Sequence, residues 1–245
     1  MKTLEQRRSI RKYTDKEVED TLLNKLLTEA ERTQTMGNLQ LYSVVATRND
    51  EIKEKLSPAH FNQSMVKEAS VVLTFCADFH RTSLWATYRD AKPGYDNFLS
   101  FMNAATDTLL YCQTFCNLAE EAGLGLCFLG TTIYMPKQII EILKLPKLVF
   151  PIATITLGWP DENPDLSDRL PMESILHKET YEDYNAEKID KFYHEKESLP
   201  ENKHFCEINH KETLAQIFTD IRYTKKDNEA MSKGLIEALK QQGFL

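Results

Sequence analysis

The chain has 245 residues, of which 42% are hydrophobic and 27% are charged, as in ordinary soluble proteins with a substantial core. Its net charge of -7 argues against a nucleic-acid binder. The longest uncharged runs are too short to cross a bilayer, and no apolar segment follows the basic N-terminal residues, so neither a membrane span nor a signal peptide is predicted.

The five cysteines form an odd set without a CxxC pair, and Cys76, Cys112, Cys116 and Cys127 lie in apolar surroundings. This pattern favours reduced, buried thiols in a cytoplasmic protein. No cluster of histidines accompanies them, so we predict no metal site.

The first half of the chain alternates helical and strand patterns. A capping box at 14–17 is expected to open an amphipathic helix that ends near Thr33. Further on, the sequence predicts strands at 41–47 and 70–77, the second buried on both faces, and helices at 51–56 and 79–88.

A long apolar helix from Phe98 to about residue 122 is the central element. Two apolar stripes run along it, so little of it is expected to face water. Gly123 and Gly125 end the helix, and residues 126–129 read as a buried strand that ends at Gly130. Asp107 is the lone charge in its middle, and we predict a structural hydrogen bond there, without a catalytic role.

The remaining sequence predicts a helix at 136–143, a strand at 150–157 and a long loop at 160–171. A charged helical tail follows Tyr181, and its last helix is expected to end at Gly243. The order of helices and buried strands favours an α+β or α/β layer structure with a central sheet.

Four short segments carry binding signals, each with a plain structural alternative. The basic and hydroxyl side chains at 6–11 suit a phosphate or form a solvated chain start. The polar loop at 35–40 suits a flat ring or is a turn built on Gly37. Arg169 could close on an anion or form a surface salt bridge.

The glycines at 123, 125 and 130 follow a helix and precede or end a strand, which reverses the dinucleotide-binding order and disfavours a Rossmann site. No nucleophile elbow or HExxH motif is present. His60 and His80 are expected to be surface or helix-end residues. Weak anion and ring signals without a nucleophile indicate that a cofactor carries the chemistry.

Taken in order, the motifs RRSIR, TMGNLQ, VVLTFCADFHR, GLGLCFLG and LGWPDENPDLSDRLP resemble the FMN-dependent nitroreductase family. The similarity is greatest to its NADPH-type flavin reductases and oxygen-insensitive nitroreductases, and it covers roughly residues 4–180. It implies a single α+β domain over 1–245 with a central, mostly antiparallel sheet, flanking helices and a long buried central helix. It also implies an intertwined homodimer with FMN at the subunit interface, and residues from about 181 as an extension that wraps the body or the partner.

The resemblance also implies roles by position. The expected FMN-binding residues are Arg7, Arg8, Ser9, Arg11, Thr35, Met36, Asn38, Gln40, Asn62, Gln63, Phe128, Leu129, Gly130 and Arg169. The N-terminal group and Arg169 would contact the phosphate or ring, and the loop at 35–40 would reach the FMN of the other subunit. Asn62 and Gln63 would hydrogen-bond the ring's pyrimidine edge, and the segment 128–130 would pack on the ring.

Two positions depart from the flavin reductase pattern. Ser167 replaces a lysine, so one expected phosphate contact is either lost or supplied by another residue, and Thr131 replaces a glycine next to the ring. Arg222, Lys225 and Lys226 could meet the 2′-phosphate of NADPH, although a solvated helix start explains the same charges.

The implied activity is ping-pong transfer of a hydride from NADPH or NADH to FMN and then to a nitroaromatic, quinone or flavin. The implied partners are a second copy and a small-molecule acceptor, with no nucleic acid and no membrane. Two alternatives stay open: a flavin-binding or regulatory protein with little turnover, or another reductive chemistry such as dehalogenation or flavin breakdown on the same fold.

Overall fold

The computed structural model describes residues 2–245. The chain divides into two compact units. The first contains the chain up to Asp165 and again Met231–Leu245, and the second is Leu166–Ala230. The change in composition at residue 181 therefore falls inside the second unit. How the extension packs stays a prediction.

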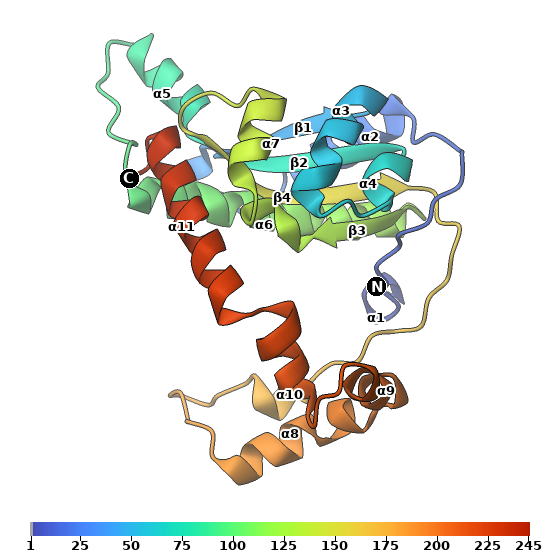
Figure 1. Cartoon of the computed structure of the whole chain (residues 1–245). Helices are drawn as coiled ribbons and strands as arrows, with labels where there is room; N and C mark the ends of the chain where they lie inside the picture. Colours follow the sequence, from blue (N-terminus) through green and yellow to red (C-terminus); the bar gives the residue numbers. More distant parts are fainter. Residues whose placement is uncertain (1) are drawn as a thin grey trace. The chain divides into compact units, whose positions relative to one another are not determined.

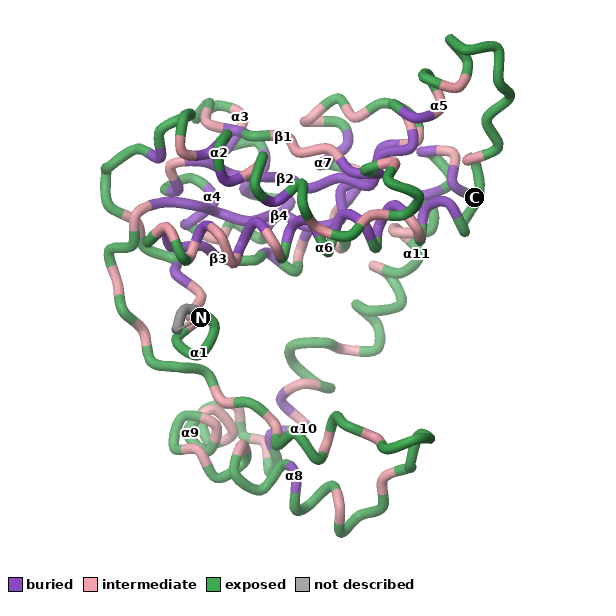
Figure 2. The backbone as a smooth tube through the Cα atoms, turned by 180° about the vertical axis from the view of Figure 1, so that it is seen from behind, coloured by how far each residue is buried: buried purple, intermediate pink, exposed green. Residues whose placement is uncertain are grey.

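The first unit is built on a four-stranded antiparallel sheet in the order β1-β2-β4-β3. Its strands are β1 (Tyr42–Thr47), β2 (Val71–Asp78), β3 (Gly125–Leu129) and β4 (Val149–Gly158). Every residue of β2 and β4 is buried, which explains their continuous apolar sequences (Figure 2). The predicted antiparallel sheet is confirmed.

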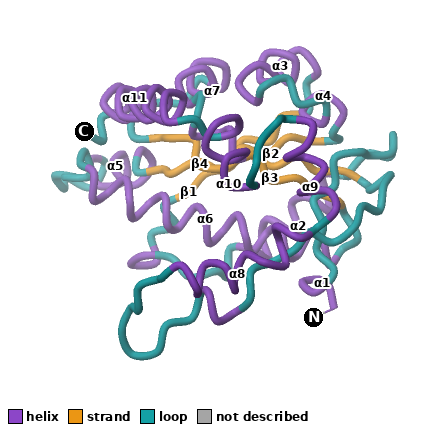
Figure 3. Tube along the Cα trace, turned by 60° about the horizontal axis from the view of Figure 1, so that its bottom comes forward, coloured by secondary structure: helices purple, strands orange, loops and turns teal. Residues whose placement is uncertain are grey.

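Helices cover both faces of this sheet (Figures 1 and 3). The first unit contains α1 (Lys2–Glu5), α2 (Asp20–Ala30), α3 (Asp50–Leu56), α4 (Met65–Glu68), α5 (His80–Thr87), α6 (Phe98–Glu121) and α7 (Pro136–Leu143). Helices α2 and α6 lie on one face, while α3, α4 and α7 lie on the other. Three short turns, η1 (Met36–Asn38), η2 (Ser57–His60) and η3 (Gly130–Ile133), connect these elements.

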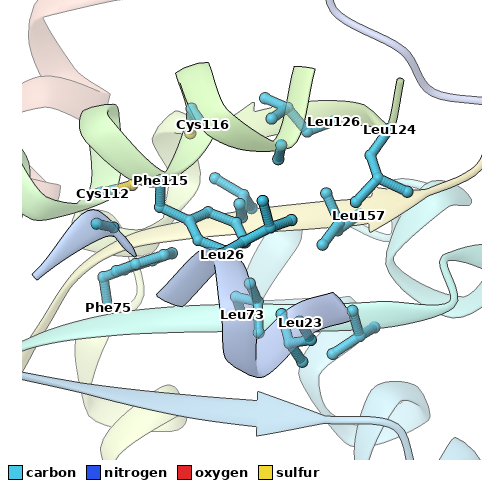
Figure 4. Packing of buried hydrophobic residues seen from close by; sticks show 14 of the residues in the cluster. Leu23, Leu26, Leu73, Phe75, Cys112, Phe115, Cys116, Leu124, Leu126 and Leu157 are labelled. Carbon is cyan, nitrogen blue, oxygen red and sulfur yellow. The ribbon is translucent and has the colours of Figure 1, made fainter. Parts of the chain in front are cut away.

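Helix α6 begins where Asn97 caps it, because the Asn97 side-chain oxygen accepts from the Ser100 N–H at 2.9 Å. One face buries Cys112, Phe115 and Cys116 against α2 and the sheet (Figure 4). The opposite face leaves apolar side chains exposed in the single chain: Leu99, Met102, Leu109 and Leu110. The expectation that little of α6 faces water is therefore wrong for the single chain, because only one face of the helix is covered by the sheet and α2.

The predicted capping box at 14–17 is wrong. Helix α2 starts at Asp20, and its N-cap Glu19 makes no side-chain cap bond. The Thr14 N–H instead donates to the Trp159 carbonyl at 2.9 Å, because the segment before α2 lies along the sheet. The capping-box pattern is therefore not used, because Thr14 makes a backbone hydrogen bond to a residue distant in the sequence.

The second unit has a small core of its own. Its helices are α8 (Ala186–Ser198), α9 (Pro200–Ile208) and α10 (Leu214–Ile217), and α11 (Lys225–Gln242) begins in it and continues into the first unit. Phe192, Leu214 and Ile217 are its buried apolar side chains. Across both units, none of the helices formed by residues 2–245 combines the length and the apolarity needed to span a membrane.

Candidate functional site

Residues 7–14, here called the strap, run along the edge of the sheet beside β3 and the end of β4. The Ile10 N–H donates to the Leu126 carbonyl at 2.9 Å, and the Asp161 N–H donates to the Lys12 carbonyl at 3.0 Å. Tyr13 forms an isolated antiparallel bridge with Pro160. Backbone hydrogen bonds thus fix the basic N-terminal motif beside β3, the strand that ends just before Gly130.

Two glycines make this close approach possible. A Cβ atom at Gly125 would lie 2.7 Å from Cγ2 of Ile10, and one at Gly158 would lie 2.7 Å from Cδ1 of Tyr13. Gly123 has a φ of 83° and terminates α6, where its N–H donates to the Glu120 carbonyl. Gly123 and Gly125 are therefore structural positions, as the sequence indicated.

The side chains of the strap differ in how strongly the protein holds them. Arg7 is half-buried with its guanidinium 3.8 Å from Glu120, and Arg8 donates to the Pro164 carbonyl at 2.5 Å. Ser9 is half-buried, whereas the side chain of Arg11 is exposed. The Arg11 backbone N–H donates to the Glu162 carboxylate at 2.5 Å. Arg11 is thus well placed to offer a cation to a ligand.

Arg7 and Glu120 belong to the walls of two cavities in the first unit. The smaller cavity, of about 300 Å³, lies beneath the strap and reaches Gly125 and Asn163. The larger one, of about 450 Å³, lies between α6 and β3 and is lined by Arg7, Leu109, Cys112, Gln113, Cys116, Glu120, Leu126 and Phe128. Burial raises the pKa of Glu120, and the nearby Arg7 charge opposes that rise.

The end of β3 presents three consecutive predicted residues in different ways. Phe128 is 48% exposed, whereas Leu129 is buried in the core. A Cβ atom at Gly130 would meet no atom within 4 Å. Leu129 therefore offers almost no surface to a ligand, while Phe128 offers an apolar surface and Gly130 allows close approach to the chain.

Asn62 and Gln63 follow the η2 turn. Phe61 and Asn62 have φ values of 56° and 55°, and the Gln63 side-chain amide donates to the His60 carbonyl at 3.0 Å. The Asn62 side chain is exposed. The left-handed segment at Phe61 and Asn62 therefore exposes the Asn62 amide to solvent, beside the η2 turn that the Gln63 side chain holds through the His60 carbonyl.

His60 links this corner to the turn after Gly130. Its ring is fully buried, and Nδ1 lies 2.8 Å from Oγ1 of Thr131. Burial lowers the pKa of His60 to about 4. Of the two positions expected for it, surface or helix end, His60 takes the second, because it is the last residue of η2 and is buried there. The Thr131 hydroxyl therefore binds His60, which gives this departure from the family pattern a structural partner.

The loop at 35–40 is held by Asp107 of α6. The Thr35 hydroxyl donates to Asp107 Oδ2 at 2.5 Å, and the Met36 N–H donates to Oδ1 at 3.0 Å. The structural hydrogen bond predicted for Asp107 is confirmed. Asn38 and Gln40, in the same loop, are exposed.

Within the first unit, the loop at 35–40 and the strap meet α6 at different places, the loop at its middle and the strap at its C-terminal end. The loop at 35–40 meets the helix at Asp107, and Arg7 meets it at Glu120. Those two positions are 13 residues apart, which corresponds to about 20 Å along a helix. One chain therefore does not bring the loop and the strap into one place.

Arg169 belongs to the second unit. Its side chain is exposed and donates to the carbonyls of Ser167 and Asp168, at 3.3 and 2.7 Å. Arg222, in the same unit, stacks 4.6 Å from the ring of Phe205, and Lys225 pairs with Glu229. Residues 2–245 contain no group of three His, Cys, Asp or Glu side chains that could hold a metal ion.

The fold and the site together define a class of protein. It is an α+β chain whose basic N-terminal strap lies beside β3, the edge strand that precedes Gly130. The chain belongs to the Nitroreductase family, whose model matches residues 4–159.

Three known proteins are similar to this chain. The chain is 34% identical over 183 residues to an FMN reductase (NAD(P)H) of Bacillus subtilis, with 74% of each chain covered. It is 34% identical over 175 residues to an oxygen-insensitive NADPH nitroreductase of Salmonella typhimurium, with 71% of each covered. A crystal structure from Bacteroides fragilis has 62% identity and a TM-score of 0.99 over 100% of both chains.

Proposed function

We propose that this protein is an FMN-dependent NAD(P)H oxidoreductase of the nitroreductase and flavin reductase type. The observation that carries the proposal is the strap, which fixes Arg8, Ser9 and Arg11 beside the open end of β3. The family membership supports it, as do the relatives named FMN reductase and NADPH nitroreductase.

The chemistry of these residues fits FMN. Guanidinium groups and a hydroxyl are suitable donors to a phosphate, and Arg11 is exposed enough to provide one. The exposed Phe128 and the open side of Gly130 suit a flat aromatic ring that approaches the backbone. Asn62 and Gln63 add amide groups at the corner that His60 ties to the Gly130 turn.

FMN, when bound, supplies the group that accepts a hydride from NADPH or NADH and returns it to a nitroaromatic, quinone or flavin in a ping-pong cycle. The protein's own contribution is electrostatic and positional. Cationic side chains such as Arg11 favour an anionic ligand, and backbone near Gly130 can come close to it. No side-chain acid or base is required for hydride transfer, which agrees with the lack of a nucleophilic constellation.

The active form in this proposal is a homodimer. The loop at 35–40 meets the middle of α6 and the strap meets its C-terminal end, about 20 Å along the helix, so in this proposal a second copy brings the loop of one chain to the strap of the other. The exposed apolar side chains Leu99, Met102, Leu109 and Leu110 give α6 a surface suited to such a contact. The five cysteines are free thiols, which favours the reducing cytoplasm.

Absorbance spectroscopy tests the proposal. Purified protein, or protein mixed with FMN and dialysed, is expected to show flavin bands in the visible. Anaerobic addition of NADPH or NADH should bleach them, and a nitroaromatic, quinone or free flavin should restore them. Protein that binds no FMN would contradict the proposal, whereas bound FMN that neither nucleotide bleaches would leave only a flavin-binding role.

A further inference from the structure

We propose that Asp107 is a positioning residue that holds the loop at 35–41 in its ligand-binding shape before any ligand arrives. The inference deepens the proposed function and rests on it, because it takes Asn38 and Gln40 of this loop as contacts to FMN.

The first observation is the convergence of the loop on one carboxylate. Asp107 is 1% exposed and accepts from the Thr35 hydroxyl, the Met36 N–H and the Leu41 N–H. The Thr35 hydroxyl oxygen in turn accepts from the Gln40 N–H at 3.0 Å. A single side chain of α6 therefore fixes both the start and the end of the loop.

The second observation is the backbone of the loop itself. Gly37, Asn38 and Gln40 have φ values of 56°, 55° and 50°. Glycine adopts this left-handed conformation freely and asparagine tolerates it, but glutamine does so at a cost. Such a backbone persists only where its surroundings hold it, and residues held this way cluster at functional sites.

A second clamp acts on the same loop from β2 and α5. The guanidinium of Arg81 donates to the carbonyls of Gln40 and Tyr42, and the Arg81 N–H donates to the buried carboxylate of Asp78. Asp107 and Arg81 thus satisfy backbone groups of the loop from inside the protein. The side chains of Asn38 and Gln40 are left exposed, with no side-chain hydrogen bond to any of residues 2–245.

A carboxylate suits this position better than its amide. Asp107 faces three donors and offers only acceptors, whereas an asparagine would turn an NH₂ group toward some of those same donors. The loop would then lose part of its restraint. A loop ordered in advance loses less entropy on binding, so the predicted consequence of its release is weaker ligand affinity.

The test is a double-mutant cycle read out by FMN affinity and by stability. Apoprotein variants Asp107→Asn, Asn38→Ala, Gln40→Ala and the two combinations are titrated with FMN by fluorescence quenching. Asp107→Asn is expected to raise the FMN Kd by about tenfold, the effect of losing roughly one well-made hydrogen bond. Asn38→Ala and Gln40→Ala each raise the FMN Kd by some factor in the wild type. In the Asp107→Asn protein, the same substitutions should raise the FMN Kd by less than half of that factor.

Urea unfolding of the same apoproteins separates positioning from plain structure. It gives the free energy of unfolding of each variant, so that the change in FMN Kd can be compared with the loss of stability that each substitution causes. Thr108→Val is the matched control. Thr108 is the next residue on α6, is fully buried, and donates only to the Ala104 carbonyl of its own helix. The Thr108→Val variant should be less stable than the wild type but should bind FMN with the same Kd.

A destabilised Asp107→Asn protein with an unchanged FMN Kd would overturn the inference, and so would effects of the loop variants that stay fully additive in FMN affinity. If Asn38→Ala and Gln40→Ala have no effect in the wild type, this inference falls while the proposed function stands. If the wild type binds no FMN, both fall.

Hydrogen exchange gives an answer even if Asp107→Asn does not fold. The amides of Met36 and Leu41 in the wild-type apoprotein should already be protected, and FMN should change that protection by no more than about twofold. Amides that become protected only after FMN binds would show that the loop is not formed in advance, and the inference would fail.

Discussion

The side chains of the strap differ in the contacts that they make within the protein, and therefore in how directly their substitution reports on ligand binding. Arg7 is tied to Glu120 and Arg8 to the Pro164 carbonyl, so the loss of either side chain also removes a contact within the protein. Arg11 has an exposed side chain, and it is the backbone N–H of Arg11 that binds Glu162.

Arg11→Ala is therefore expected to weaken FMN binding without unfolding the protein. Charge-assisted hydrogen bonds contribute about 1.5–3 kcal/mol, which corresponds to an increase in FMN Kd of about 10- to 100-fold. Equilibrium dialysis followed by absorbance measures the retained FMN, and circular dichroism checks the fold. Unchanged flavin occupancy would contradict the role assigned to Arg11.

His60 makes stability depend on pH. Burial lowers its folded-state pKa from 6.5 to about 4, so between these values the unfolded chain binds a proton that the folded protein does not. Stability is fully present above pH 6.5 and falls as the pH drops toward 4, by up to about 3 kcal/mol. Urea unfolding at pH 7, 6, 5 and 4 measures it.

The control for this prediction is His60→Gln, which carries no ionisable group. The difference between the unfolding free energies of wild type and variant should shrink as the pH falls, because all other titrating groups are shared. Two curves that stay parallel from pH 7 to 4 would exclude His60 as the source.

At the scale of elements, the close packing of the strap on β3 and β4 depends on two glycines. The Ile10 side chain occupies the space that a Cβ atom at Gly125 would need. Because the strap also carries Arg7 to Arg11, its packing and its binding role are linked through the position of one backbone segment.

Gly125→Ala should displace the strap. Overpacking of this kind costs about 1–3 kcal/mol, and the shift of the cationic residues should weaken FMN binding as well. Gly94→Ala is the matched control, because a Cβ atom there meets nothing within 4 Å. Urea unfolding and FMN titration of both variants make the comparison. A Gly125→Ala protein that is as stable as Gly94→Ala would contradict the prediction, because the strap would then accommodate the added methyl group without cost.

At the scale of the whole molecule, the exposed apolar face of α6 predicts self-association. Leu109→Glu places a charge in that face, where Leu109 is 47% exposed in the single chain. We expect the variant to shift from dimer to monomer and to lose FMN, because the loop of one chain would no longer reach the strap of another. Analytical ultracentrifugation and flavin absorbance report the two effects.

Leu245→Glu serves as the control, since Leu245 is similarly exposed but does not lie on α6. It should leave both the mass and the flavin content unchanged. A Leu109→Glu protein that is still dimeric and still yellow would contradict the assignment of this face to the interface.

Much of the fold could be read from the sequence because its elements have strong local patterns. The buried strands β2 and β4 are continuous apolar runs, and helix α7 begins at a proline, so their bounds were predicted to within one residue. The capping box at 14–17 failed because a backbone hydrogen bond from Thr14 to Trp159 competes with the local motif. Short helices such as α4 are missing from the prediction, since four residues carry too little periodicity.

The sequence alone determined a layered α and β structure with a central sheet and, through the order of its motifs, the family, while the residues that it assigns to the candidate site stay a prediction. These follow from patterns that lie within a few neighbouring residues or from the order of motifs along the chain. Only the tertiary structure decided that Asp107 holds the loop at 35–41, that His60 is buried against Thr131 and that Ile10 fills the space beside Gly125. Each of these depends on atoms more than 60 residues apart in the chain, and a one-dimensional pattern carries no information on which distant side chains meet.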